Sequence, residues 1–531
     1  MQISFVPHGG MPKLAWIARV EPQASKFLAT LGEWVEIQAH SFIEGVADNE
    51  FSSGALDETA CMFGSGAVIR GEAVTFVSST ATTDYLYWLA ADDGRVVHVS
   101  NSLPLLLAGL NDRLDPRCLN YSEINHSIVF GVQRYRKQIP TSKGAVNRLI
   151  HRNLQVSAAG VTETDKPIAP RFSVFSEYRD YLASSYARIA KKARDVKRQR
   201  PMAIFSTQSR GHDSSAINAV AKDFGVVRAF TVSKGKARGM LATQDRKFEV
   251  NDDGTQICER FGIPCVQIER RALEGDSEHE SLYYAAPDDN GDFNLQQIGF
   301  HVTQPTALLT GSLGELWYPA SHSDDKPNST NGDLVRWDLS THGLTEVRLE
   351  TGFVQLAMPF IGATSREDIL RTTESPEMDP WRLGTTYDRP IPRRIAEEAG
   401  LAREMFGQVK MASVLEYPAP RLPLNPALRR LFFSFLVDNG LLARWQIPLF
   451  PLILKWNTII GTTSPKVHTW NYYLQRAVSR LIGRPFTFPL LWRHLNGSIF
   501  CFCVNRRVDE LRQRLNRQGR AAQSPQRNDV S

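Results

Sequence analysis

The stretch "PMAIFSTQSRGHDSSAINAV" (residues 201–220) contains a short apolar run, a polar turn and the start of an amphipathic helix. The run "MAIF" predicts a buried strand. After the turn, apolar residues at positions i, i+3, i+4 and i+7 predict a helix that Gly225 ends. Those apolar residues are Ile217, Val220, Ala221 and Phe224. A strand that leads through a tight turn into a helix is the basic unit of an α/β sheet.

The same alternation continues downstream. "VVRAFTV" (226–232) predicts the next strand, "GTQICERFG" (254–262) a helix, "PCVQI" (264–268) a strand and "TALLTG" (306–311) another strand. Alternating strands and helices of this kind form a parallel sheet with helices on both faces. We therefore predict an α/β domain whose first strand is "MAIF".

The regions on either side differ from this pattern. Residues 1–165 contain short β-branched or aromatic runs ("AVTFVSS", "YLYWLAA", "VVHVSNS") separated by turns, which predict a β-rich domain. "TETDKPIAPR" (162–171) reads as a linker, and residues 175–200 as a helix. From about residue 335 the chain is predicted to be mainly helical, with a disordered polar tail. The predicted domains are 1–165 and 175–505, and the tail is 506–531.

Composition places few limits on function. The chain has 531 residues, 42% of them hydrophobic and 22% charged, with a formal charge of +6 that does not indicate nucleic acid as a partner. Six scattered cysteines form no disulfide framework and no zinc-site spacing. The N-terminal residues lack the order of a signal peptide. We expect a cytoplasmic protein with reduced thiols.

One region, Leu431 to Ile460, is rich in apolar residues and could suggest a membrane segment. Charged residues, prolines and glycines interrupt it, so no run approaches the ~18 residues of a membrane span. Buried helices are the prediction for this region. Peripheral attachment to a membrane stays open as an alternative.

The turn "STQSRGHDSS" lies where ligands bind in an open parallel sheet, beyond the carboxyl end of a strand. A helix start there offers free N–H groups to phosphate, three serines (Ser209, Ser214 and Ser215) add hydroxyl groups, and Gly211 permits close approach. Asp213 would suit a Mg²⁺ ion shared with phosphate. The alternative is a Ser or Asp N-cap on an ordinary helix. The chain has no GxxxxGK[ST] motif, and "GSGAVIRG" at Gly64 has the wrong spacing for GxGxxG.

Residues 209–214, "SRGHDS", resemble the SGGxDS loop of the ATP pyrophosphatases, specifically of the asparagine synthetase family. Three further segments resemble family motifs in the family's order: "LLTGSLGELW" (308–317), "VQLAMPFIG" (354–362) and "FGQVKMAS" (406–413). The segment "TTDYLYWLAADDGRVVHVSNSLPLLLAG" (82–109) resembles class II glutaminase domains. The resemblance covers roughly residues 30 to 415.

The resemblance implies an N-terminal glutaminase-like (Ntn-type) β-sandwich and a C-terminal HUP-like ATP pyrophosphatase domain with a helical end. It implies ATP and Mg²⁺ as cofactors, with Asp213 and Glu315 as metal ligands and Lys410 at the departing pyrophosphate. These three residues are the implied catalytic set. The implied nucleotide-binding residues are Ser209, Arg210, Gly211, Asp213, Ser214, Ser215, Thr231 and Gly311.

Several positions depart from the family pattern. Residue 2 is Gln rather than the N-terminal nucleophilic cysteine, and the first cysteine is the internal Cys61, so glutaminase activity is not expected. Gln355 and Ala357 replace the charged pair of the family's ExRxPFLD segment. Ser312 stands where β-lactam synthetases carry a catalytic tyrosine, so that reaction is not expected.

The expected activity is ATP-dependent amide formation: a carboxylate of a small molecule or peptide is adenylated and transferred to ammonia or a substrate amine. The alternative is an inactive nucleotide-binding or partner protein of the same fold. A homodimer is compatible with the sequence.

A histidine and a group of arginines lie near the motifs. His212 is predicted to be an exposed turn histidine, with contact to ATP as the alternative. Arg389, Arg393 and Arg394 form either a pocket for an anionic substrate or a solvated helix start.

Overall fold

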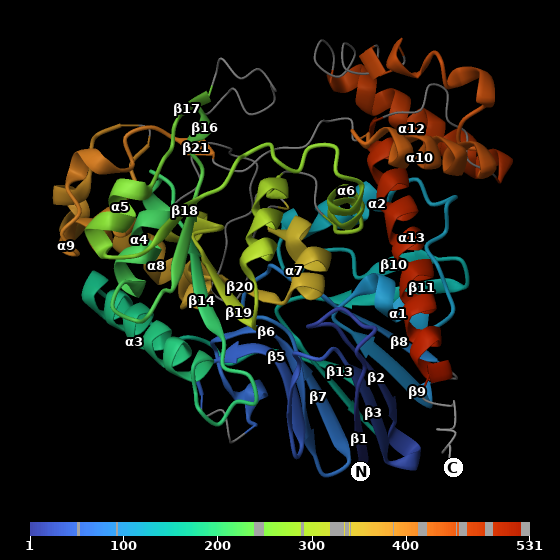
Figure 1. Ribbon diagram of the computed structural model, residues 1–531, viewed down its shortest axis with the longest axis horizontal. Helices are drawn as coiled ribbons and strands as arrows, with labels where there is room; N and C mark the ends of the chain where they lie inside the picture. Colours follow the sequence, from blue (N-terminus) through green and yellow to red (C-terminus); the bar gives the residue numbers. More distant parts are fainter. Residues whose placement is uncertain are drawn as a thin grey trace, which may run out of the picture.

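The structure of the protein is a computed structural model (Figure 1). It describes all residues except 50–53, 92–93, 238–248, 288–290, 319–333, 335–338, 340, 386, 413–421, 453, 456–464, 484–491 and 522–531. The N-terminal part consists of two β-sheets, followed by a parallel α/β sheet and a helical C-terminal region. This is the architecture that the sequence predicts.

The two N-terminal sheets pack face to face. One has seven strands in the order β1 (Gln2–Pro7), β3 (Lys26–Leu31), β2 (Trp16–Glu21), β9 (Val96–Ser100), β8 (Leu86–Ala91), β11 (Gly144–Leu149) and β10 (Gln138–Thr141). The other has six, in the order β13 (Gly160–Thr164), β12 (Asn153–Ser157), β7 (Ala73–Val77), β6 (Met62–Arg70), β5 (Ser41–Ala47) and β4 (Glu36–Gln38). All pairs except β1–β3 are antiparallel.

Aromatic residues fill the space between these sheets. Trp16 of the first sheet stacks on Phe76 of the second at 5.8 Å and meets Phe42 edge-on at 5.0 Å. All three are fully buried. Alternating strand residues therefore form a sandwich core, as the period-two pattern requires. The strands predicted at "AVTFVSS", "YLYWLAA" and "VVHVSNS" are confirmed as β7, β8 and β9.

The third sheet contains five parallel strands in the order β18 (Cys265–Gln267), β15 (Arg228–Thr231), β14 (Ala203–Thr207), β19 (Thr306–Thr310) and β20 (Phe353–Ala357). The chain moves outward from β14 to β15 and β18, then returns and moves the opposite way through β19 and β20. The strand order therefore reverses between β14 and β19. Such a switch point opens a crevice at the carboxyl ends of the two strands.

Helices cover both faces of this sheet (Figure 1). On one face lie α3 (Phe175–Ala193), α4 (His212–Ala221), α5 (Thr255–Phe261), α8 (Arg366–Glu374) and α9 (Pro390–Glu398). On the other lie α6 (Ser277–Tyr284) and α7 (Thr345–Thr351). A small sheet of β17 (Glu249–Asn251), β16 (Lys234–Ala237) and β21 (Met411–Ala412) stands beyond the carboxyl ends of the strands.

The remaining helices join the two ends of the chain. α1 (Leu103–Gly109) and α2 (Tyr121–His126) pack against the last helix, α13 (Trp492–Ala521), and α10 (Pro426–Asp438) and α12 (Pro465–Ile482) lie at its upper end (Figure 1). Asn505 of α13 bonds both the N–H and the carbonyl of Leu114 at 2.8 and 3.1 Å. The C-terminal helix thus belongs to the same core as the N-terminal part.

A buried charge cluster connects the sandwich to the α/β region. Arg348 of α7 pairs with Glu44 of β5 at 3.1 Å and with Asp84 at 2.7 Å. The side chains of Arg348 and Glu44 are completely inaccessible to solvent. An unpaired charge in this position would be costly, so the three groups hold the two parts in one arrangement.

Some predicted boundaries were wrong. The helix predicted to reach residue 200 ends at Ala193, and the first residues of the predicted linker are the end of β13. β20 lies in a region predicted to be helical. α13 continues to Ala521 through residues assigned to the disordered tail, because Val508 and Leu511 are buried in the core. Residues 522–531 of that tail lie outside the described residues.

Candidate functional site

A cavity of about 230 Å³ lies at the switch point between β14 and β19. Its floor is formed by the loop after β14 and the loop after β19, which contribute Ser209, Gly211, Asp213, Gly311 and Glu315 among others. The carboxyl end of β15 adds an apolar wall. Residues from far along the chain, including Lys410 just before β21, close the other side.

The helix that points into this cavity begins without a side-chain cap. The N-cap of α4 is Gly211, which has no side chain to accept a hydrogen bond from the N–H groups of the first turn. By contrast, the Asp276 side chain caps α6 by accepting from two backbone N–H groups at 3.0 Å. The alternative that a Ser or Asp side chain caps an ordinary helix is therefore wrong for α4. Its first N–H groups and the positive end of its dipole face a lined cavity, the usual setting for an anion.

The serines of the turn hold the loop in this shape. The Ser209 hydroxyl accepts from the Gly211 N–H at 3.1 Å, and the Ser214 hydroxyl accepts from the Ser209 N–H at 3.1 Å. The two hydroxyl oxygens are 2.9 Å apart. Both residues line the cavity. Both hydroxyl groups thus stabilise the loop, and they can also donate to or accept from a ligand in the cavity.

Two amides that the sequence analysis did not single out support this loop from below. Gln208 donates to the Ser209 carbonyl at 2.6 Å and accepts from Asn218 of α4 at 2.7 Å. Asn218 in turn donates to the Thr207 carbonyl at 3.0 Å and accepts from Ser206 at 2.6 Å. The available sequence signal for these two amides was a polar residue on the buried side of a predicted strand and of a predicted helix. Buried amides need hydrogen-bond partners.

The second loop packs directly on Asp213. A Cβ atom at Gly311 would lie 2.8 Å from the Asp213 carbonyl carbon and 2.9 Å from the Ser214 nitrogen, and a Cβ at Gly314 would overlap the Asp213 carboxylate itself. Only glycine permits this approach. Glu315 follows on the 3₁₀ turn Gly314–Trp317, and its side chain lines the same cavity. Two acidic side chains from separate loops therefore meet at one place.

The electrostatics of Asp213 are those of an incompletely compensated carboxylate. Burial raises its pKa to about 7, with Glu315 adding to the rise, while Lys410 and Arg389 oppose it. Its Oδ1 atom is buried and has no hydrogen-bond partner in the described part of the chain. A buried carboxylate oxygen without a partner is costly unless a cation or a donor completes it.

These residues fit a Mg²⁺ ion shared with phosphate. Mg²⁺ is commonly held by one or two carboxylates together with phosphate oxygens and water, and here Asp213 and Glu315 supply the carboxylates. Among the described residues there is no group of three or more His, Cys, Asp or Glu side chains that could hold a metal alone. The donor set therefore suits a metal that arrives with an anionic ligand.

The other predicted nucleotide-binding residues are placed differently. Thr231 lines the cavity, and its hydroxyl accepts from the Gly254 N–H at 2.9 Å. Ser215 does not line it, because its hydroxyl donates to the Gly211 carbonyl at 2.8 Å. Arg210 also stays outside the cavity lining: its guanidinium donates to the Met405 carbonyl at 3.3 Å, and its backbone N–H donates to Asp252. The bulky Arg210 side chain therefore does not block the approach of a ligand to the loop backbone.

The prediction that His212 is exposed was wrong. The ring is completely buried, 4.7 Å from Tyr387 and 5.8 Å from Phe406. Burial and the nearby Arg393 and Arg389 lower its pKa to about 3, so it is neutral. It packs α4 against the segment that leads to Lys410 and does not line the cavity.

The arginine block near residue 390 lies at the start of α9, as one of the two predicted arrangements has it, but its arginines are not solvated. Arg393 is fully buried, pairs with Glu397 at 3.2 Å and donates to the Gly407 carbonyl at 3.0 Å. Arg394 pairs with Glu377 and Glu398, each at 2.7 Å. Arg389 stacks 3.5 Å above the centre of the Tyr318 ring. All three arginines are engaged within the protein.

Several lining residues were not predicted. Tyr387 and Asp292 line the cavity, as do the apolar Phe230, Val232, Ile268 and Leu295. Their sequence positions gave no signal, because they are brought together only by the return of the chain from β18 to β19 and by β21. The apolar group forms a wall of the cavity beside the loop after β14.

No protein-family model matches the chain. No curated protein matches it either. Fold and site together define a two-part protein in which a β-sandwich adjoins a parallel α/β sheet that carries an acidic cavity and a free helix start at its switch point.

Proposed function

We propose that the protein is an ATP-dependent, AMP-forming carbon–nitrogen ligase and a divergent member of the asparagine synthetase family. The observation that carries the proposal is the uncapped start of α4, in whose first turn Asp213 has a carboxylate oxygen that lacks a partner within the described residues. A free helix start suits the phosphates and an unpaired carboxylate suits their Mg²⁺. The order of the sequence motifs supports the assignment to the asparagine synthetase family.

In this proposal each residue of the cavity has a defined task. The first N–H groups of α4 and the hydroxyls of Ser209 and Ser214 bind the phosphates. Asp213 and Glu315 hold Mg²⁺, which when bound neutralises charge on the phosphate oxygens. Lys410 places its ammonium group at the pyrophosphate that leaves. Phe230, Val232, Ile268 and Leu295 accept the base.

The proposed reaction consists of two steps. A substrate carboxylate oxygen attacks the α-phosphorus of ATP, pyrophosphate leaves, and an acyl-adenylate forms. Ammonia or an amine then attacks the acyl carbon, AMP leaves, and the nitrogen loses a proton. The protein contributes positioning and charge neutralisation in both steps.

The sandwich is proposed to be structural rather than a glutaminase. Cys61 is 2% exposed, and burial raises the pKa of its thiol well above the usual range. The α-amine of Met1 lies at the surface near the Gly71 carbonyl, with no cysteine beside it in sequence. Ammonia or a substrate amine is therefore the proposed nucleophile, and the cytoplasm, with all six cysteines free, the proposed location.

ATP–pyrophosphate exchange tests this function. The purified chain with MgATP is mixed with labelled pyrophosphate and a broad panel of carboxylates, and label should enter ATP with at least one of them. Asp213→Asn should abolish the exchange, and Ser312→Ala, at a cavity residue given no role, should retain it. Absence of exchange with every carboxylate, together with absence of ATP binding by calorimetry, would refute the enzyme and the nucleotide site alike.

A further inference from the structure

The segment from Pro426 to Ile482, which contains α10 and α12, is strongly basic. It has seven Lys or Arg residues and one acidic residue, Asp438. The segment therefore carries a net charge of +6, the same as the net charge of the whole chain, which has 62 Lys and Arg against 56 Asp and Glu. Such an asymmetry indicates an anionic partner for this part of the molecule.

The same segment exposes apolar side chains. Of 19 large hydrophobic residues exposed in the described part of the chain, nine lie here: Leu431, Trp445, Leu449, Leu452, Trp470, Tyr473, Leu474, Leu481 and Ile482. α10 buries Leu428, Phe432 and Leu436, so the buried-helix prediction holds for that face. It fails for Trp445, Leu449 and Leu452, which are 63%, 42% and 65% exposed.

On α12 the exposed residues form one face. Trp470, Tyr473, Leu474, Ala477 and Leu481 recur at spacings of three and four residues and are all exposed. The opposite face holds the helix to the body, since Gln475 is 1% exposed and Arg476 pairs with Glu123 of α2 at 3.3 Å. The apolar face therefore points away from the protein, at the end of the molecule farthest from the sandwich (Figure 1).

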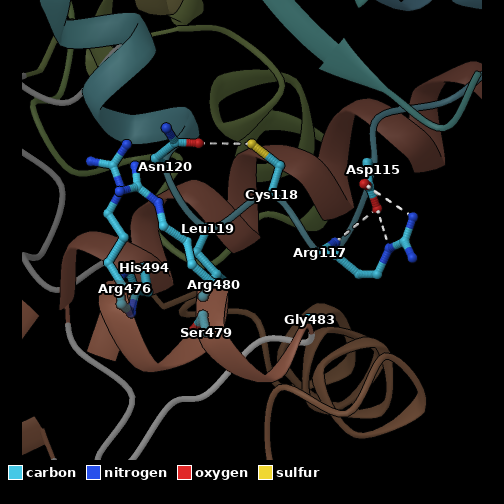
Figure 2. A pocket seen from close by; sticks show the side chains of 10 residues that line it. All are labelled: Asp115, Arg117, Cys118, Leu119, Asn120, Arg476, Ser479, Arg480, Gly483 and His494. Carbon is cyan, nitrogen blue, oxygen red and sulfur yellow. Dashed lines mark hydrogen bonds and ion pairs between the residues drawn. The ribbon is translucent and has the colours of Figure 1, made fainter. Parts of the chain in front are cut away.

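Basic residues border this face. A cavity of about 340 Å³ lies between α12 and the segment before α2, and Arg476, Arg480 and Arg117 line it. Figure 2 shows the Arg476 and Arg480 side chains extending from α12 toward Asn120 on the opposite wall. The Arg480 side chain is exposed, and no ion pair to it occurs among the described residues. Guanidinium groups beside an apolar helix face can bind phosphate while leucines and aromatic rings enter the lipid.

We propose that α12 docks the protein on an anionic phospholipid surface, with its Trp470–Leu481 face in the lipid interface and Arg480 on lipid phosphates. A helix with aromatic and leucine residues on one face and arginines beside them is the pattern of an interfacial helix. Within the described ranges no helix is long and apolar enough to cross a membrane, so the helix lies on the surface. Nucleic acid would match the charge but would leave the leucines in water.

Flotation of the full chain with lipid vesicles tests the proposal, and it does not depend on any activity of the cavity at the switch point. Binding should be at least ~10-fold stronger to phosphatidylcholine vesicles that contain phosphatidylserine than to pure phosphatidylcholine, and should fall at high salt. Leu474→Gln with Leu481→Gln should lose at least ~10-fold of this binding. The control, Val196→Gln at a site that is 93% exposed and lies outside this segment, should keep it.

A second pair of variants tests the charges. Arg480→Gln should weaken binding to phosphatidylserine vesicles several-fold, whereas Lys197→Gln should not. Thermal unfolding by circular dichroism should be unchanged in all four variants, because each side chain is exposed. Equal binding to both kinds of vesicle, no binding to either, or unchanged binding of the leucine variant would overturn the proposal. So would self-association of the wild type that the leucine variant abolishes, since the face would then be covered by a second copy.

Discussion

Two clusters in this molecule each contain two carboxylates and one cation, and they are built in opposite ways. In the cluster between the sandwich and the α/β region, Arg348 pairs with Glu44 and Asp84 at 3.1 and 2.7 Å, and the charges complete one another. In the switch-point cavity, Asp213 and Glu315 lie with Lys410 around open space, and Asp213 keeps an oxygen that has no partner among the described residues. The first cluster is closed and structural, and the second is open to a ligand.

The difference shows how to distinguish a binding site from a structural network by its contacts. Buried ion pairs satisfy each charge within the protein, and removal of one member leaves the others uncompensated. A site that binds a cation and an anion must keep its charges incompletely paired, at a cost in stability. Substitutions should therefore affect stability at the first cluster and binding at the second.

The largest stability effect is expected at the closed cluster. Arg348→Met removes the one positive charge that, among the described residues, pairs with Glu44 and Asp84, and should lower the free energy of unfolding by about 3–5 kcal/mol. Urea denaturation followed by circular dichroism measures it. A loss below about 1 kcal/mol would mean that the two carboxylates are not held by Arg348.

The next effect concerns the contact between the two loops of the open cluster. Gly314→Ala would place a methyl group onto the Asp213 carboxylate and should cost about 1–3 kcal/mol of unfolding free energy. In an Asp213→Ala background the same change should cost at least ~1 kcal/mol less, because the overlapping atoms are gone. Urea denaturation of the four proteins measures this coupling. Additive costs would show that the loops do not meet there.

A pH dependence of stability should follow from Asp213. Its pKa is raised to about 7 in the folded protein from 3.8, so the folded state binds more protons than the unfolded state between these values. The contribution of Asp213 to stability must then fall as pH rises from about 4 to about 7 and level off above that. Glu346 and Asp252, with pKa values of about 7 and 6, contribute in the same direction.

The Asp213 share is isolated by comparison with Asp213→Asn. Between about pH 5 and pH 8 the wild type should lose about 2–3 kcal/mol more than the variant. Urea unfolding at the two pH values measures the difference. If both proteins respond equally, Asp213 does not carry the raised pKa.

The smallest effect is expected for Arg210→Ala. The guanidinium donates to the Met405 carbonyl outside the cavity lining, and the backbone N–H that meets Asp252 is retained in the variant. Affinity for MgATP should change by less than about threefold, which corresponds to ~0.6 kcal/mol. Calorimetry measures it, and a loss of tenfold or more would place the arginine in the nucleotide site.

Local sequence patterns were sufficient to predict the strand–turn–helix unit at β14 and α4, because apolar periodicity and the glycine stop are local signals. The same holds for β15, β18 and β19. β20 was missed because "FVQLA" stands among helices, and its pairing with β19 is a long-range contact. The predicted helical region ended too early, at residue 505, because the burial of α13 depends on α1 and α2, which are almost 400 residues away in the chain.

Asp213 and the serines of the first loop could be named from the sequence because they follow a predicted strand, and Glu315 could be named because its segment resembles a family motif. His212 and the arginines around residue 390 could not be placed, because only tertiary packing decides whether a polar residue near a turn is buried. Gln208 and Asn218 were overlooked for the same reason. Their hydrogen bonds run beneath the loop, and no spacing in the sequence reports them.

The central claim is that Asp213 and the free start of α4 bind Mg²⁺ and ATP together. Isothermal titration calorimetry of the wild type and Asp213→Asn with ATP, with and without Mg²⁺, tests it most directly. We predict that the wild type binds ATP in a Mg²⁺-dependent manner and that the variant loses at least ~100-fold in affinity while remaining folded. Equal, Mg²⁺-independent binding by both proteins, or binding by neither, would contradict the claim.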